Sequence, residues 1–336
     1  AVTGSLSDKA PEAFAQDFKL FSTEIFRPIL WTVTFIGLTH FIVVSGVKEG
    51  IERTSKVMMP ILFLILLALC IRSVTLPNAS EGLYFLFKPD FSKITSAVVL
   101  SAMGQAFFSL SIGMGCLITY SSYFSKDTKM QITALQVTIL DTLVAVMAGI
   151  MIFPAVFSFG IAPTAGPELV FITLPNVFQQ LPMGAIWSLV FFLLLALAAL
   201  TSTISLHEVA TAYVHEEYQI TRTKAAWFVS GGVMVLGILS SLSIGIWKEY
   251  TLFGLTFFDL LDYLTAKIML PFGGMLICIY LGNRVDRKIL KEELTNKGTV
   301  PFYFFNTYAF FMKYIAPIAI GMIFLNELGI IQWLMG

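Results

Sequence analysis

One stretch in the middle of an apolar segment reads GQAFFSLSIGMG, residues 104–115. If this segment crosses a membrane, its glycines and serines are unusual, because each backbone N–H and C=O in hydrocarbon needs a partner within the protein. They indicate either a break in the helix or close packing against a neighbouring helix through small residues. A break would free carbonyl oxygens to coordinate a cation or an amine, whereas packing would not. These residues alone leave both interpretations open.

The whole chain has the composition of a membrane protein. Hydrophobic residues make up 57% of it and charged residues only 12%, which is far from the soluble average. The formal net charge is 0, so no basic surface favours nucleic acid as a partner. Eight stretches are long and apolar enough to cross a bilayer. They lie near residues 29–47, 57–75, 97–123, 131–158, 184–213, 225–244, 252–281 and 302–332.

Loops rich in Lys and Arg alternate with loops that are poor in them. The rich loops follow the first, third, fifth and seventh expected spans, and the long connection at 159–183 has neither residue. Because loops with excess positive charge stay in the cytoplasm, both ends of the chain should lie outside. The chain opens on a polar stretch through Asp17 and not on a signal region. We therefore expect an N-terminally truncated, multi-pass protein of the plasma membrane, in bacteria the inner membrane.

Histidine and cysteine do not predict a metal site. The pair His207-Glu208 suggests a zinc-protease motif, but the next histidine is His215 and not a residue at i+4. His40 stands alone in a span and is expected to hydrogen-bond to another helix. The three cysteines lie in apolar spans without CxxC spacing, and are expected to pack there: Cys70, Cys116 and Cys278.

A hydroxyl-lined stripe marks the fifth expected span. Ala198, Thr201, Ser202 and Ser205 are spaced at i, i+3, i+4 and i+7, so they share one face of a helix. Such a stripe is typical of a packing seam. Hydroxyls beside a carbonyl are also the hard oxygen ligands that an alkali cation prefers. Without further context, the packing seam is favoured.

Charged residues also lie in or at the expected spans. Asp141 lies well inside the fourth span, where a carboxylate is costly unless it is paired, protonated or facing water, so a functional role is predicted. Asp259 and Asp262 open the seventh span, and Lys267 follows. At about 100° per residue, Lys267 lies nearer the Asp259 face. A pair between Asp262 and Lys267 is therefore not expected.

Several strings, in order along the chain, resemble the neurotransmitter:sodium symporter family. GQAFFSLSIGMG, with ITYSSY at 118–123, closely resembles its sixth transmembrane helix, and FITLPNVF at 171–178 resembles its extracellular lid loop. GIER at 50–53 followed by Met59-Pro60 resembles the join of helices four and five, and LTS at 200–202 the centre of helix eight. The resemblance covers nearly the whole chain.

The resemblance implies an all-α, polytopic bundle with the leucine-transporter-type inverted-repeat fold. Residues 1–336 would form a single transmembrane transporter domain of about eight spans, equivalent to helices four to eleven of the eleven-helix bacterial branch. Helices one to three would be absent. Residues 159–183 would form the extracellular lid loop.

The implied function is sodium-coupled symport of a neutral amino acid, hydrophobic and aromatic ones included, by alternating access. It implies two sodium ions, no organic cofactor and no enzymatic activity. Backbone carbonyls of Phe108 and Ser109 would hold the substrate amine. The implied side-chain pocket is Phe108, Ser111, Met114, Thr203 and Leu206. The implied sodium ligands are Ser109, Asp141, Ala198, Thr201 and Ser202. The implied gating residues are Asp262 outside, and Tyr123 and Glu216 on the cytoplasmic side.

Two other functions compete with symport. A receptor or scaffold of the same fold should have lost ion ligands, yet Ser109, Thr201 and Ser202 keep their oxygens. A channel is disfavoured because nothing suggests a ring-built pore. Ala145 stands one turn beyond Asp141, where some bacterial relatives carry a carboxylate. Asp141 itself is therefore expected to supply the negative charge beside sodium, so that transport needs no chloride.

Overall fold

The computed structural model describes residues 11–160, 166 and 169–331. Within these residues the regular elements are helices, apart from an isolated bridge between Leu252 and Leu255. Seven helical stretches there are long and apolar enough to cross a membrane. They are Phe26–Val44, Val47–Val74, Met130–Ser158, Gly184–Glu217, Arg222–Ile244, Phe257–Asn283 and Phe305–Glu327.

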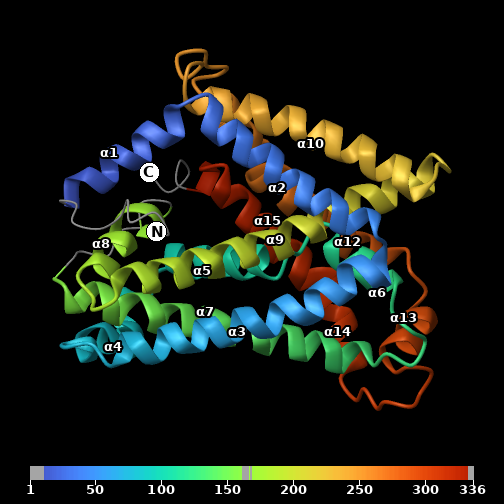
Figure 1. The fold of residues 1–336 in the computed structure, drawn as a ribbon. Helices are drawn as coiled ribbons and strands as arrows, with labels where there is room; N and C mark the ends of the chain where they lie inside the picture. The colour runs from blue at the N-terminus through green and yellow to red at the C-terminus, as the bar shows by residue number, and fades with distance from the viewer. Residues whose placement is uncertain (1–10, 161–165, 167–168, 332–336) are drawn as a thin grey trace. The chain divides into compact units, whose positions relative to one another are not determined.

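Of the eight expected spans, only the third, 97–123, is not a continuous helix in the part of the chain that the structure describes. It consists of α5 (Ser96–Ser109) and the short α6 (Cys116–Ser122), with irregular backbone between them, as Figure 1 shows. Of the two interpretations that the sequence left open for residues 104–115, the break is therefore present. The other seven expected spans each correspond to one of the long helical stretches.

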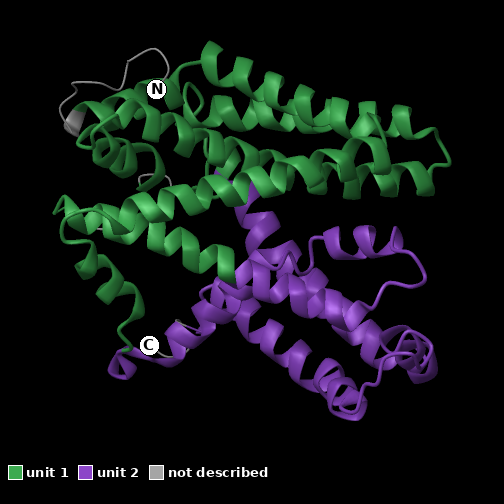
Figure 2. Ribbon diagram, turned by 60° about the horizontal axis from the view of Figure 1, so that its bottom comes forward, with its two compact units in different colours: residues 1–89, 143–258 green, residues 90–142, 259–336 purple. Residues whose placement is uncertain are grey.

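The chain divides into two compact units, which are coloured separately in Figure 2. Unit 1 contains residues 1–89 and 143–258, and unit 2 contains residues 90–142 and 259–336. The long helix α7 (Met130–Ser158) contributes its first part to unit 2 and the rest to unit 1.

Unit 1 is built around the long helix α9 (Gly184–Glu217). Helices α2 (Phe26–Val44), α3 (Arg53–Val74) and α10 (Arg222–Ile244) pack against it, and α2 also lies along α10 (Figure 1). Its apolar core includes Leu66, Met151 and Phe191. The remaining elements are α1 (Pro11–Thr23), η1 (Val47–Glu52), α4 (Ala79–Phe87), η3 (Leu169–Thr173) and α8 (Leu174–Gln179).

The expected lid loop, 159–183, contains η3 and α8, and α8 packs on α9. Residues 161–165 and 167–168 of that prediction lie outside the described residues. Helix α8 begins with Leu174-Pro175, and a proline fits the first turn because no intrahelical partner is needed for its nitrogen there. The role of this segment as a lid stays a prediction.

Unit 2 is built around α12 (Leu270–Asn283), which packs on α15 (Ala316–Glu327). Its apolar core includes Phe107, Cys278, Ile320 and Ile323. Gly282 allows a close approach, because an added Cβ there would lie 2.7 Å from the Cα of Lys313. The remaining elements are η2 (Phe91–Lys93), α11 (Phe257–Asp262, which begins in unit 1), η4 (Tyr263–Met269), α13 (Arg287–Leu294), α14 (Phe305–Phe310) and η5 (Phe311–Ile315).

Candidate functional site: a broken helix and a hydroxyl cluster

The backbone between α5 and α6 is held in conformations that ordinary residues avoid. Ser111, Gly113 and Gly115 have φ values of +54°, +86° and +81°. Glycine adopts such angles without penalty, whereas serine does so at a cost. The N–H groups of Ser111 and Ile112 donate back to the carbonyls of Phe108 and Phe107, at 3.0 and 3.2 Å. The last carbonyls of α5 therefore lie outside the regular helical ladder.

Two glycines let this break pack directly on α12. An added Cβ at Gly113 would lie only 2.4 Å from the carbonyl oxygen of Leu270. On the facing helix, an added Cβ at Gly274 would lie 2.7 Å from the ring of Phe107. Backbone thus meets backbone and ring without intervening side chains, which fixes the position of the break within unit 2.

Two of the predicted ligands of the first sodium site meet beside the break. The Ser109 hydroxyl, at the end of α5, points at the Asp141 carboxylate on α7, with its Oγ 2.7 Å from Oδ1 and 2.9 Å from Oδ2. The single hydroxyl proton is shared between the two carboxylate oxygens. The lone pairs of the hydroxyl oxygen remain available as ligands. A carboxylate and a hydroxyl together form a hard oxygen site of the kind that suits an alkali cation.

The predicted ligands of the second sodium site gather on α9 in unit 1. The hydroxyls of Thr201 and Ser202 both donate to the carbonyl of Ala198, at 2.9 and 3.2 Å. We call these three residues the hydroxyl cluster. Helix α9 stays continuous through the cluster. Its oxygens therefore come from two side chains and from the Ala198 carbonyl, which accepts both bonds. Back-bonding of this kind also occurs in packing seams, and the role in ion binding stays a prediction.

The predicted substrate residues are divided between the units. Phe108, Ser111 and Met114 lie at the break in unit 2, while Thr203 and Leu206 lie on α9 in unit 1. Phe108 is 52% exposed and Leu206 50% exposed. The substrate pocket itself stays a prediction.

The predicted gating residues lie at or near the ends of helical stretches. Asp262 closes α11, Tyr123 follows α6, and Glu216 is exposed in the last turn of α9. Lys267 lies in η4, with its ammonium 5.6 Å from the centre of the Tyr263 ring. That cation–π contact was not anticipated. The gating roles stay predictions.

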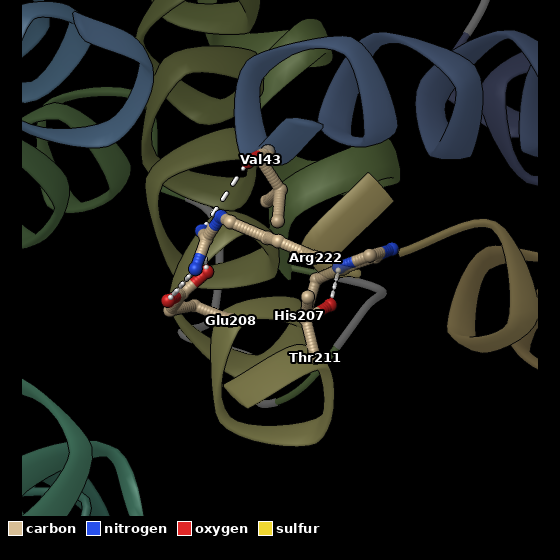
Figure 3. A network of polar contacts seen from close by, with 5 residues as sticks. All are labelled: Val43, His207, Glu208, Thr211 and Arg222. Carbon is tan, nitrogen blue, oxygen red and sulfur yellow. Dashed lines mark hydrogen bonds and ion pairs between the residues drawn. The ribbon is translucent and has the colours of Figure 1, made fainter. Parts of the chain in front are cut away.

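A buried ion pair in unit 1 was not anticipated from the sequence. Glu208 is 0% exposed, and Arg222 donates to both of its oxygens, Nη1 to Oε1 at 2.9 Å and Nη2 to Oε2 at 2.5 Å. Nη2 of Arg222 also lies 3.3 Å from the carbonyl of Val43, so three helices meet at one guanidinium (Figure 3). The sequence signal that could have predicted this ion pair was a glutamate inside a span, followed by an arginine at the start of the next helix.

The prediction for His40 is confirmed. Its Nδ1 lies 2.7 Å from the Ser230 hydroxyl on α10. The same hydroxyl lies 2.7 Å from Nε2 of His207 on α9, a second contact that the sequence did not indicate. Among the described residues, no group of three or more His, Cys, Asp or Glu is placed to hold a metal ion. The three cysteines are buried and free.

The fold is that of a polytopic helical membrane protein with one broken span. A profile of the Sodium:neurotransmitter symporter family matches residues 8–334, so the chain belongs to that family. It is 38% identical over 334 residues to the uncharacterized sodium-dependent transporter YhdH of Bacillus subtilis (strain 168), covering 98% of this chain and 73% of the relative. An uncharacterized sodium-dependent transporter of Haemophilus influenzae is 39% identical over 301 residues, covering 89% and 65%.

A solved structure is also similar. It is the crystal structure of MhsT in complex with L-phenylalanine, with a TM-score of 0.85 and 42% sequence identity, covering 97% of this chain and 74% of that one. The fold class predicted from the sequence is therefore confirmed. Family, apolar helices and bacterial relatives together identify a multi-pass membrane protein of the inner membrane.

Proposed function

We infer that the protein to which this chain belongs couples the uptake of a neutral amino acid to sodium. Family membership supports sodium-coupled symport in general. The similar MhsT structure is a complex with L-phenylalanine, which supports a neutral and aromatic substrate for this chain. The single observation that carries the proposal is the meeting of Ser109 and Asp141 beside an unwound membrane helix.

The first ion would bind at this meeting point. Sodium would bind the Ser109 oxygen and one Asp141 oxygen as ligands, and the negative carboxylate would balance its positive charge. The irregular carbonyls of the break could then hold the substrate amine, as broken helices do in other transporters. In that arrangement the ion and the substrate share Ser109, which would make their binding mutually favourable.

The second ion would bind at the hydroxyl cluster of α9. Its three oxygens already converge within one turn of helix. The substrate side chain would contact Phe108, Ser111 and Met114 from the break, and Thr203 and Leu206 from α9. A thioether among apolar groups adapts to several shapes, which favours neutral side chains over charged ones. Asp262, Tyr123 and Glu216 would act as gates at the two ends of the pathway.

Uptake measurements test the proposal. The full-length protein is reconstituted into proteoliposomes, and radiolabelled L-phenylalanine is supplied under an inward sodium gradient or with choline in place of sodium. We expect accumulation that depends on the gradient and that unlabelled neutral amino acids suppress, while aspartate and lysine do not. Accumulation that is equal without sodium, or that only charged amino acids suppress, would contradict the proposal.

A further inference from the structure

A buried chain of four polar side chains crosses three helices of unit 1. His40 on α2, Ser230 on α10, and His207 and Thr211 on α9 follow one another at hydrogen-bond distance, and we call them the histidine chain. The contacts are 2.7 Å from His40 Nδ1 to Ser230 Oγ, 2.7 Å from Ser230 Oγ to His207 Nε2, and 3.0 Å from His207 Nδ1 to Thr211 Oγ1. None of the four is more than 5% exposed.

The protons of this chain can be counted from the geometry. Ser230 has one hydroxyl proton and lies between two ring nitrogens, so it must donate to one ring and accept from the other. With both rings neutral, hydrogen bonds can be donated in one direction along the chain, from His40 to Ser230, from Ser230 to His207 and from His207 to Thr211. They can equally be donated in the other direction, from Thr211 back to His40. Both directions pair the three contacts along the chain, and only the second also leaves a His40 N–H for the backbone contact at Ala226.

One added proton is accommodated just as well. If the added proton is on His207, its two N–H groups donate to Ser230 and Thr211, while Ser230 donates to His40. If the added proton is on His40, one N–H donates to Ser230 and the other to the backbone of Ala226, while Ser230 donates to His207. The proton therefore has two positions, joined by the Ser230 hydroxyl, and in both of them every ring N–H has an acceptor.

A second proton does not fit. If both rings were charged, both would donate to Ser230, and the hydroxyl proton would have no acceptor. The two cations would also lie with their ring centres 6.4 Å apart, where like charges repel strongly at low dielectric. The capacity of the histidine chain is thus a single proton.

Burial of both rings opposes that charge, and the Trp227 ring offsets part of the cost at His40. The Trp227 ring of α10 lies 4.1 Å from the His40 ring, centre to centre, and an aromatic ring at that distance attracts a cation. The charged groups that act on His207 are His40 of α2, Glu208 of α9 and Arg222 of α10. Glu208 and Arg222 are paired with each other, and their charges act on His207 in opposite directions.

We propose that the histidine chain is a binding site for a single exchangeable proton, shared by His40 and His207 through the hydroxyl of Ser230. A purely structural hydrogen-bond network would keep both rings neutral. This site differs from the proposed sodium and amino-acid sites in its residues and in its ligand.

Histidine titration tests the proposal without measuring transport. The full-length protein, with ¹⁵N-labelled histidine rings, is placed in lipid nanodiscs and followed by NMR from about pH 5 to about pH 9, around the ordinary histidine pKa of about 6.5. Signals are assigned with His40→Gln and His207→Gln. We expect both rings to shift with one common midpoint and a combined uptake of one proton. No titration, two independent midpoints or an uptake of two protons would overturn the proposal.

Two variants sharpen the result. Ser230→Ala removes the shared hydroxyl, so the common midpoint should separate into two. Thr211→Val removes the second partner of His207, so the larger share of the proton should move to His40 while the total stays at one. His215 is the internal control, because its Nδ1 contacts the carbonyl of Ile220 and lies outside the chain. A wild-type titration with a common midpoint that survives Ser230→Ala unchanged would also overturn the proposal.

Discussion

The break between α5 and α6 and the unbroken helix α9 present oxygen atoms by different means. The break uses backbone carbonyls and requires positive φ values at Ser111, Gly113 and Gly115. Helix α9 keeps its backbone ladder and uses the hydroxyls of Thr201 and Ser202. The first arrangement depends on glycine and on tight packing, so it should tolerate few substitutions. The second depends on side chains and one carbonyl of an intact helix, so a side-chain substitution should change binding while leaving the fold intact.

The largest effect is expected for Gly113→Ala. The substitution combines an unfavourable φ with a Cβ 2.4 Å from the Leu270 oxygen, which together should lower the free energy of unfolding by about 3 kcal/mol. The thermal midpoint of the full-length protein in detergent measures this loss. Gly231→Ala on α10 is the matched control, because nothing lies within 4 Å of an added Cβ there. Equal thermal midpoints for the two variants would show that the break tolerates substitution as well as a regular helix does.

The next effect concerns charge at the break. Asp141→Asn keeps an oxygen for sodium but removes the negative charge, so the sodium concentration for half-maximal uptake should rise about tenfold, equivalent to about 1.4 kcal/mol. Wild-type uptake should persist when gluconate replaces chloride, and the variant should become dependent on chloride. Asp127→Asn, in an exposed loop, is the control. Wild-type transport that collapses without chloride would show that Asp141 does not balance the charge.

A smaller effect is expected on α9. Thr201→Ala combined with Ser202→Ala removes two neutral ligands, so half-maximal sodium should rise about fivefold, equivalent to about 1 kcal/mol, with little change in unfolding. Thr138→Ala on α7 is the control, because its hydroxyl makes the same kind of bond, to the Ala134 carbonyl. An unchanged sodium dependence with a lower thermal midpoint would identify the cluster as a packing seam.

The smallest effect is expected for Ser111→Gly. Glycine relieves the strain of a φ of +54°, but it also increases the entropy of the unfolded chain, so the net change in stability should be under about 1 kcal/mol. Ser111→Val, which is β-branched, should destabilise clearly more. Equal midpoints for the two Ser111 variants would mean that the backbone there relaxes freely.

Features set by local spacing were predictable from the sequence, and those set by distant contacts were not. The spacing of Ala198, Thr201 and Ser202 predicts that they share a helix face, and their oxygens do converge. Residues 104–115 left a break and close packing equally open, because the choice depends on Leu270 and α12, far along the chain. The structure contains both, since Gly113 is in the break and also packs tightly.

Two contacts show the same limit in other ways. The pairing of Glu208 with Arg222 depends on which helices become neighbours, and hydrophobic periodicity does not specify that. For Lys267, the argument from about 100° per residue assumed an α-helix. The segment Tyr263–Met269 is a π-helix, whose wider turns change the facing direction of every residue in it.

The clamp of Arg222 on Glu208 has a consequence for how the chain enters the bilayer. The two residues belong to consecutive helices, α9 and α10, and lie 14 positions apart. A lone charge at the centre of an inserting helix costs about 3 kcal/mol, but this carboxylate and guanidinium neutralise each other within one helical hairpin. The pair can form as soon as α10 emerges from the ribosome, so α9 and α10 would be inserted together with this carboxylate already paired.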